Sequence, residues 1–232
     1  MKLFQKETGY RYNSDTLLLY DFISSFNPKG NLLDVGCGCG ILALLLKRDF
    51  PHLQVNLLDI QEENCAIARA NATQNNIEID SFTCKNFLES SFEKPFDIIV
   101  SNPPFYHAGS VKSDDDHLTI SRHSSYLPLD TFAKHASKWL VNKGYFIVCY
   151  DAKQSDALIV ALMNAHLKIE DMRFVHTKAD NDASLVLIRA RKNSKTMCKV
   201  HPSLTVMEGS LYSLDVQAIF DKSQTKSYPW QN

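Results

Sequence analysis

The segment SNPPF, residues 101–105, follows the apolar run FDIIV and combines a side-chain amide, two prolines and an aromatic ring. Proline has no N–H and fixes its own φ, so two consecutive prolines end a strand ladder and stiffen the backbone. Asn102 and Phe105 are therefore held at a strand end, where an amide and a flat ring suit a planar polar group. A simple strand stop has the same appearance, so the interpretation needs support from the rest of the chain.

A second candidate site is the segment DVGCGCG, in which Gly36, Gly38 and Gly40 alternate between an apolar run and a helix-like run. Glycines at such a turn let the backbone approach a ligand closely and leave N–H groups at the positive end of the helix. The spacing is not that of the dinucleotide fingerprint G-x-G-x-x-G, because Ile41 stands where the third glycine would be. Asp34 precedes the loop and suits a cationic ligand, such as one with an amino group and a sulfonium, better than a pyrophosphate.

Asp59 ends the next apolar run, nineteen residues after Gly40. Its carboxylate is expected at the end of the strand beside the glycine loop, where it can accept both hydroxyls of a ribose. An ordinary tight turn would explain the alternating glycines alone, but it would not explain Asp34 and Asp59 at these positions.

Strand-like and helix-like segments alternate from residue 31 to about residue 190, which is typical of βαβ units on a parallel sheet. Two further strands, 168–177 and 183–191, are separated by a short polar turn and are expected to pair antiparallel. The other strands are expected at 31–35, 53–59, 78–84, 96–101 and 144–150, and the helices at 41–49, 62–74, 128–140 and 153–165.

The organisation expected from these patterns is one domain, 1–232, with three parts: an amino-terminal segment (1–30), the α/β core (31–192) and a carboxyl-terminal extension (193–232). The extension is expected to contain a turn at MEGS and a short helix at 214–220. The polar segment 108–126 follows the same strand end as Asn102. A loop of this length in a compact domain is usually functional or mobile.

Charge is balanced over the chain, with 25 basic and 26 acidic residues, which argues against a uniformly basic nucleic-acid binder. Basic residues are nevertheless concentrated near both ends, and if the ends met they would form a basic rim that could follow phosphates. A solvated tail is the alternative. The basic residues concerned are Lys2, Lys6, Arg11, Arg189, Arg191, Lys192, Lys195 and Lys199.

Apolar runs are too short to span a bilayer, and the amino terminus lacks the apolar core of a signal peptide. The chain is therefore expected to be cytoplasmic and not membrane-bound, with reduced cysteines.

No Cys/His pair follows Cys37 and Cys39 at the spacing of a zinc finger, so no metal site is expected. The oligomeric state is left open, with a monomer expected.

Together, the glycine loop, the acid after the second strand and SNPPF resemble the class I S-adenosylmethionine-dependent methyltransferases. The resemblance implies a Rossmann-like α/β fold with a mostly parallel seven-stranded sheet, an antiparallel hairpin at one edge and S-adenosylmethionine as cofactor. Asn86 stands where the family often has an acid and would bond the adenine amino group, while Phe87 would pack on the ring. Cofactor contacts are expected for Tyr12, Asp34, Gly36, Cys37, Gly38, Gly40, Asp59, Ile60, Asn86, Phe87 and Asn102.

The resemblance also implies chemistry at an exocyclic amine, because methylases of planar amines carry an Asn-Pro-Pro-aromatic motif at the fourth strand end. The lone pair of such an amine is delocalised into its ring. Hydrogen bonds to the Asn102 side-chain oxygen and the Pro103 carbonyl would orient the nitrogen toward the methyl group. Phe105 would stack on the target base, which must be extruded from its neighbours. The expected catalytic residues are Asn102, Pro103, Pro104 and Phe105.

More specifically, the chain resembles the bacterial tRNA1(Val) N6-adenine methyltransferases, which modify an adenine beside the anticodon. The similar segments include YRYNSDTLLLYDF, SRHSSYLPLDTF, HTKADNDASLVLIRARK and LYSLDVQAIF. The resemblance implies a tRNA substrate and an amino-terminal segment that closes over the cofactor. Arg122 is expected to contact a phosphate of the RNA, with His123 nearby.

Two other methyltransferase classes share the Asn-Pro-Pro-aromatic motif: ribosomal RNA guanine-N2 methyltransferases and glutamine N-methyltransferases that act on release factors. The second class carries a helical domain before the glycine loop, and only about thirty residues precede the loop's strand here. A DNA adenine methyltransferase would need an added recognition domain. A non-enzymatic cofactor-binding module would leave the Asn-Pro-Pro-Phe motif unexplained.

Overall fold

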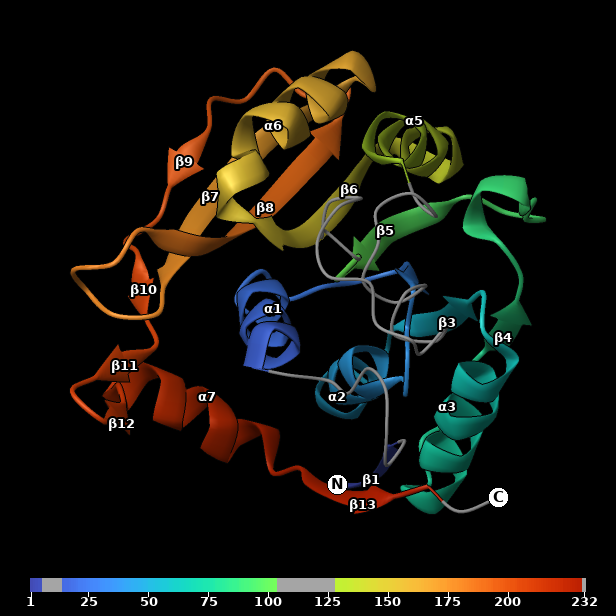
Figure 1. Cartoon of the computed structure of the whole chain (residues 1–232). Helices are drawn as coiled ribbons and strands as arrows, with labels where there is room; N and C mark the ends of the chain where they lie inside the picture. The colour runs from blue at the N-terminus through green and yellow to red at the C-terminus, as the bar shows by residue number, and fades with distance from the viewer. Residues whose placement is uncertain (6–13, 104–127, 231–232) are drawn as a thin grey trace, which may run out of the picture.

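A computed structural model describes residues 1–5, 14–103 and 128–230, and a nine-stranded sheet lies at its centre (Figure 1). Eight strands follow the order β10-β7-β8-β6-β5-β2-β3-β4, and β9 pairs with β7. The strands β2 to β6 run parallel to one another, whereas β8 is antiparallel to both β6 and β7. The seven long strands are β2 (Asn31–Val35), β3 (Gln54–Asp59), β4 (Ser81–Cys84), β5 (Phe96–Ser101), β6 (Leu140–Asp151), β7 (Leu167–His176) and β8 (Ala183–Lys192).

The predicted mostly parallel sheet with an antiparallel pair at one edge is confirmed. The sheet is larger than the seven strands expected, because the extension adds β9 (Lys199–Val200) and β10 (Leu204–Thr205) parallel to β7. Each of these strands has two residues and Pro202 lies between them, so neither shows the alternation by which a strand is recognised.

Helices cover both faces of the sheet (Figure 1). On one face, α1, α2 and α3 share a hydrophobic cluster with Leu32 and Val55, and on the other α5 and α6 share a cluster with Leu33 and Ile99. Adjacent residues of β2 thus point to opposite faces and both are buried, which explains its continuous apolar sequence. The helices are α1 (Ser14–Ser24), α2 (Ile41–Asp49), α3 (Glu62–Gln74), α5 (Leu129–Trp139), α6 (Ser155–Asn164) and α7 (Leu214–Ser223), with 3-10 turns η1 (Phe87–Glu89) and η3 (Ala152–Gln154).

The start of α2 requires glycine. Gly40 caps the helix with a φ of 82°, and a Cβ built there would lie 3.0 Å from Leu57 Cδ2 and 3.1 Å from Ala68 Cβ. The third glycine of the loop therefore serves both the left-handed backbone and the close packing of α2 on β3 and α3. In the described part of the chain, no helix is long and apolar enough to cross a membrane.

The extension carries the chain from the sheet edge back to the amino terminus. The hairpin of β11 (Met207–Glu208) and β12 (Leu211–Tyr212) leads into α7, and β13 (Lys226–Pro229) then pairs parallel with β1 (Lys2–Gln5). Figure 1 shows these two end strands side by side beneath α2 and α3. The expected turn and helix of the extension are confirmed.

The other edge of β1 is held by Asn71 of α3 and by Asn75, which caps the carboxyl end of that helix. Asn71 accepts from the Phe4 N–H at 2.6 Å and donates to the Phe4 carbonyl at 3.0 Å, and Asn75 bonds the N–H and carbonyl of Lys2 in the same way. Side chains four positions apart lie on one helix face, so they match alternate residues of a strand. Asn71 also donates to the carbonyl of Cys39 in the glycine loop, at 2.9 Å.

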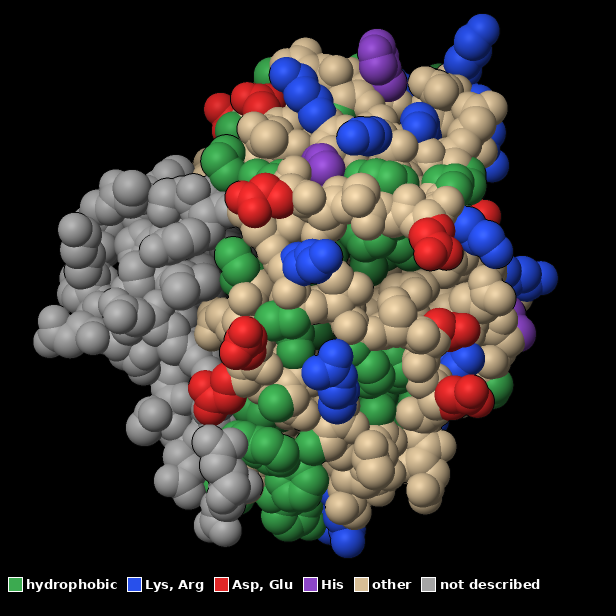
Figure 2. Space-filling model, turned by 90° about the vertical axis from the view of Figure 1, so that its right-hand side faces the viewer, with side chains coloured by type: hydrophobic (Ala, Val, Ile, Leu, Met, Phe, Trp, Pro, Cys, Tyr) green, Lys and Arg blue, Asp and Glu red, His purple; other side chains and the backbone are tan. Residues whose placement is uncertain are grey.

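Of the two alternatives for the basic residues, the described residues do not form the rim, because β1 pairs with β13 and not with the basic residues in and after β8. Arg189 is paired with Asp171 at 2.7 Å, and Arg191 lies 3.9 Å from Glu170. Lys6 and Arg11 lie outside the described residues. On the face shown in Figure 2, basic and acidic side chains are interspersed among the described residues.

The Asn71 contacts generate a test of the fold. Asn71→Ala should lower the free energy of unfolding by about 2 to 4 kcal/mol, because buried backbone groups lose their partners. Asn75→Ala removes the same kind of contact at the exposed end of β1 and should cost less than about 1 kcal/mol. Urea denaturation measures both variants, and equal losses would contradict this account of how β1 is anchored.

Candidate active site

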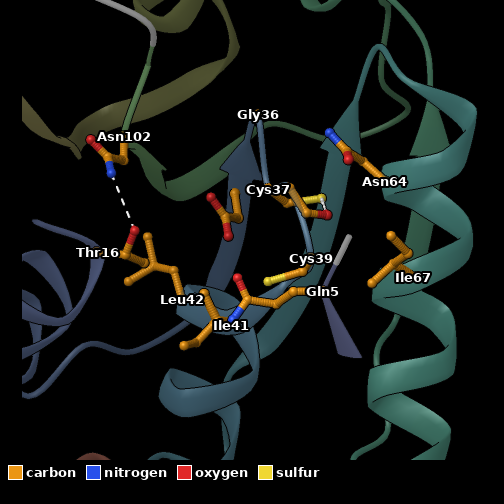
Figure 3. Close-up of a pocket in the computed structure, with 12 residues that line it drawn as sticks. Gln5, Thr16, Gly36, Cys37, Cys39, Ile41, Leu42, Asn64, Ile67 and Asn102 are labelled. Atoms are coloured by element: carbon orange, nitrogen blue, oxygen red, sulfur yellow. Dashed lines mark hydrogen bonds between the residues drawn. The ribbon is translucent and has the colours of Figure 1, made fainter. Parts of the chain in front are cut away.

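A pocket lies at the carboxyl ends of β2 and β5, between the glycine loop, the first turn of α1 and α3 (Figure 3). Ligands of open α/β sheets bind beyond the carboxyl ends of the strands, at this kind of crevice. The residues that line it are Gln5, Thr16, Asp34, Gly36, Cys37, Gly38, Cys39, Ile41, Leu42, Asn64, Ile67 and Asn102.

The glycine loop leaves open space above its backbone. A Cβ built at Gly36 or Gly38 would meet no heavy atom within 4 Å, and both residues have positive φ. The loop is anchored from below, since the Gly36 N–H donates to the Leu58 carbonyl at 2.8 Å. A ligand can therefore approach the backbone closely at the positive end of α2.

Asp59 organises this loop. Its Oδ2 accepts from the Gly38 N–H at 2.9 Å, and its Oδ1 accepts from the Gln61 N–H at 2.9 Å and from Asn64 Nδ2 at 3.1 Å. The carboxylate thus links β3, the glycine loop and α3. Its expected contact with a ribose stays a prediction, and the structure adds this second role.

Asp34 is buried at the end of β2, with 2% of its surface exposed. The backbone of Ala43 bonds its carboxyl group, but Oδ2 has no partner among the described residues. Burial, and then the negative charge of Asp59, raise the pKa of Asp34 to about 7. A carboxylate in this position is stabilised by a ligand that brings a positive charge or an N–H donor.

Asn102 is fixed at the end of β5. The buried Ser101 hydroxyl donates to the Val35 carbonyl at 2.7 Å, which joins the ends of β5 and β2. Asn102 Nδ2 donates to Thr16 Oγ1 at 3.2 Å, whereas its Oδ1 is buried without a partner (Figure 3). In the described part of the chain, Asn102 Oδ1 and Asp34 Oδ2 are the two buried side-chain polar atoms without a partner. Both residues line the pocket, so it presents two free acceptors to a ligand.

The structure brings five of the described predicted residues together in the pocket. Asp34, Gly36, Cys37, Gly38 and Asn102 line the pocket, and Gly40 caps the helix beside it. Pro103 follows Asn102 and is buried. The other predicted residues, Tyr12, Pro104, Phe105, Arg122 and His123, lie outside the described residues.

Asp59 and Gly40 belong to or contact the glycine loop without lining the pocket, and three further predicted cofactor residues do not line it either. Phe87 is 3% exposed and packs edge-on against Phe132, with ring centroids 5.5 Å apart, so burial argues against its stacking on an adenine. Asn86 caps η1 by accepting from the Leu88 N–H at 3.0 Å. Ile60 is 44% exposed. The adenine contact of Asn86 and the cofactor contact of Ile60 stay predictions.

Sequence reasoning missed several residues that line the pocket. Gln5 reaches it from β1, Thr16 from α1, and Asn64 and Ile67 from α3 (Figure 3). Asn64 and Ile67 are three positions apart on one helix face, which is the available signal for this pair. The position of Gln5 depends on pairing with β13 and has no local signal.

The two loop cysteines are part of the pocket wall. Burial raises the pKa of Cys39 to about 12 and also raises that of Cys37. Both thiols are therefore neutral near pH 7 and line the pocket as small, weakly polar groups.

Comparison with known proteins points to one family. The model of the methyltransferase small domain family matches residues 13–178. A tRNA1(Val) (adenine(37)-N6)-methyltransferase of Phocaeicola vulgatus is 28% identical over 193 residues, which are 82% of this chain and 80% of that protein. A crystal structure of a predicted O-methyltransferase from Agrobacterium tumefaciens superposes with a TM-score of 0.69, covering 92% of this chain and 99% of that chain. Its identity is 14%, so this likeness shows the fold, and the predicted Rossmann-like methyltransferase fold is confirmed.

Relatives of two other kinds also match. A ribosomal RNA small subunit methyltransferase C of Enterobacter sp. is 40% identical over 86 residues, 36% of this chain and 25% of that protein. A release factor glutamine methyltransferase of Aliivibrio fischeri is 26% identical over 160 residues, 66% of this chain and 54% of that protein. Both alternatives drawn from the sequence are thus represented among the relatives.

The raised pKa of Asp34 generates a test with two opposite effects. The pKa of Asp34 in the folded state lies above the ordinary value of 3.8. The contribution of Asp34 to the free energy of unfolding is therefore most favourable below pH 4 and is lost as the pH rises to about 7. Asp34→Asn should therefore raise the free energy of unfolding at pH 8 by about 2 to 4 kcal/mol and have little effect at pH 4. Chemical denaturation at both pH values measures the difference.

The same substitution should weaken cationic ligands. Calorimetric titration with S-adenosylmethionine should show the wild-type affinity falling about tenfold from pH 8 to pH 6, relative to Asp34→Asn, because protonation removes the negative charge. The variant corrects for titration of the ligand itself. An identical pH dependence in the two proteins would remove Asp34 from the binding site.

Proposed function

Since the chain belongs to the methyltransferase small domain family, we propose that it transfers a methyl group from S-adenosylmethionine to N6 of an adenine beside the anticodon of a tRNA. The observation that carries the proposal is the pair of buried, unpartnered acceptors, Asp34 Oδ2 and Asn102 Oδ1, in one pocket. One suits a cationic cofactor and the other suits an amine. The relative from Phocaeicola vulgatus, named for this reaction, supports the choice of substrate.

The cofactor end of the pocket comprises Asp34 and the glycine loop. S-adenosylmethionine, when bound, supplies a methyl group made electrophilic by its sulfonium. The Asp34 carboxylate, with its free oxygen, would hold the positively charged end of this ligand. The backbone over Gly36 and Gly38 leaves room for it, and Asp59 holds the loop and is the proposed ribose ligand.

The substrate end of the pocket is at Asn102. Its buried Oδ1 can accept an N–H of an exocyclic amine, and the Pro103 carbonyl is the proposed second acceptor. The two acceptors would orient the nitrogen and direct its lone pair, so that orientation supplies much of the barrier reduction. Asn102 binds the reacting amine in this mechanism and does not remove a proton from it.

The RNA contacts complete the proposal. Phe105 would stack on the extruded adenine, and Arg122 would contact a phosphate, with His123 beside it. The net charge of the chain is −1, so a general electrostatic attraction contributes little to RNA affinity. Most of that affinity would come from such local contacts. We further propose a monomeric, single-domain enzyme that acts in the cytoplasm.

Product analysis tests the function. Unmodified total tRNA is incubated with the protein and labelled S-adenosylmethionine, then digested to nucleosides. Label in N6-methyladenosine supports the proposal. Label in N2-methylguanosine of ribosomal RNA, or in a glutamine of a release factor offered in parallel, would replace it with one of the two alternatives.

Asn102→Ala should separate chemistry from binding. We expect the single-turnover rate of methyl transfer to fall with a barrier increase of about 2 to 4 kcal/mol, because the amine loses its acceptor. Cofactor affinity by calorimetry and the melting temperature should stay near the wild-type values. A fully active Asn102→Ala variant would refute the mechanism.

A further inference from the structure

We infer that Asn64 is a second ribose ligand, whose side-chain oxygen accepts one hydroxyl group of the cofactor while Asp59 accepts the other. The inference rests on the proposed function, in which Asp59 binds the ribose of S-adenosylmethionine. It gives the first turn of α3 a part in cofactor binding, in addition to its place beside the pocket.

The acceptor capacity of Asp59 is the first observation. A carboxylate has about four acceptor sites. Three protein donors already use Asp59: the Gly38 N–H at Oδ2, and the Gln61 N–H and Asn64 Nδ2 at Oδ1. A ribose presents two neighbouring hydroxyl donors. Asp59 alone therefore leaves too little capacity for both, and a second acceptor beside it is needed.

Asp59 also fixes the orientation of the Asn64 carboxamide. Asn64 Nδ2 lies 3.1 Å from Asp59 Oδ1, and both residues are buried. Each oxygen of Asp59 accepts a backbone N–H as well, and such bonds favour the ionised form of a carboxyl group. An ionised carboxylate accepts hydrogen bonds and cannot donate one. It therefore binds the NH₂ end of the carboxamide and turns the oxygen away from itself.

The Asn64 oxygen is available to a ligand. Among the described residues, the Asn64 side chain bonds Asp59 through its nitrogen, and its Oδ1 accepts no hydrogen bond. This oxygen is not one of the two buried polar atoms without a partner, so it keeps access to solvent. Asn64 lines the pocket, whereas Asp59 does not, and Figure 3 shows the Asn64 side chain pointing from α3 toward the glycine loop. The carboxamide thus brings an acceptor to the pocket wall in front of Asp59.

The position and the charge of Asn64 favour a hydroxyl group over the positively charged end of the cofactor. Asn64 is neutral and is bonded to the acid at the end of β3. The acid proposed for the positive charge, Asp34, is at the end of the neighbouring strand β2 and has its own free oxygen. A neutral acceptor next to Asp59 therefore matches the second hydroxyl of the ribose.

A cycle of protein and ligand changes tests the inference without a methyl-transfer assay. Wild type and Asn64→Ala are titrated by calorimetry with S-adenosylhomocysteine and with its 2′-deoxy and 3′-deoxy analogues. Gln74→Ala is the matched control, because it truncates an exposed carboxamide in the last turn of the same helix, outside the pocket. Melting temperatures show whether each variant is folded.

Asn64→Ala should bind S-adenosylhomocysteine about tenfold more weakly than wild type, because one hydroxyl loses its acceptor. For the analogue that lacks this hydroxyl, the same substitution should weaken binding by less than about twofold. For the other analogue the loss should again be about tenfold, since the two contacts are separate. Gln74→Ala should bind all three ligands like wild type.

The comparison between ligands separates a direct contact from an effect on the loop. No loss in Asn64→Ala, or an equal loss for all three ligands, would overturn the inference, because neither outcome couples Asn64 to a hydroxyl. A loss that is reduced equally for both analogues would also overturn it, since Asn64 would then act through Asp59.

Two further results are decided in advance. If Asn64→Ala does not fold, Asn64→Ser takes its place, because it keeps a polar group in the first turn of α3 while its side chain is too short to reach both Asp59 and a ligand. If wild type forms no N6-methyladenosine, the proposed function fails. The titrations contain no tRNA, so they still decide whether Asn64 binds the ribose.

Discussion

Burial of the Asp34 carboxylate is the constraint on which the site depends. The end of β2 places this acid in the interior, beside a second acid on β3, and its pKa is raised to about 7 as a result. Asp59 differs from Asp34 in that protein donors, including the glycine loop, occupy both of its oxygens. The free protein thus keeps one carboxylate solvated by its own loop and one that lacks a partner. An unfavourable charge at a binding site is a recognised reason why active sites reduce stability.

The remaining elements hold two acceptors at fixed positions around that charge. The ends of β2 and β5 are joined through Ser101, α1 contacts Asn102 through Thr16, and α3 holds β1 and the glycine loop through Asn71. Few of these contacts follow from local sequence. They follow from the order of the strands, which brings the ends of β2 and β5 together although they are far apart in the chain.

Much of the fold could be predicted because its signals are local. The helices 41–49 and 62–74 and the strand 96–101 have the expected bounds, since apolar patterning and flanking glycine or polar residues mark their ends. The glycine loop and Asp59 were recognisable because their roles require particular residue types at particular spacings. Thr16, Gln5 and Asn71 were not, because an uncharged polar residue acquires a role here only through a partner distant in sequence. Phe87 shows a related difficulty: its residue type suits either a ligand or the core, and its ring packs against Phe132.

The pairing of β1 with β13 has a consequence for the order in which the molecule is completed during translation. Gln5 is synthesised before the central strands, yet its strand is flanked on one side by α3 and on the other by residues 226–229, which are synthesised after them. Segments synthesised earlier generally fold earlier. A nascent chain can therefore form the central strands and the glycine loop while one wall of the pocket still lacks its outer strand. That wall is complete only after residues 226–229 have been synthesised and have paired with β1.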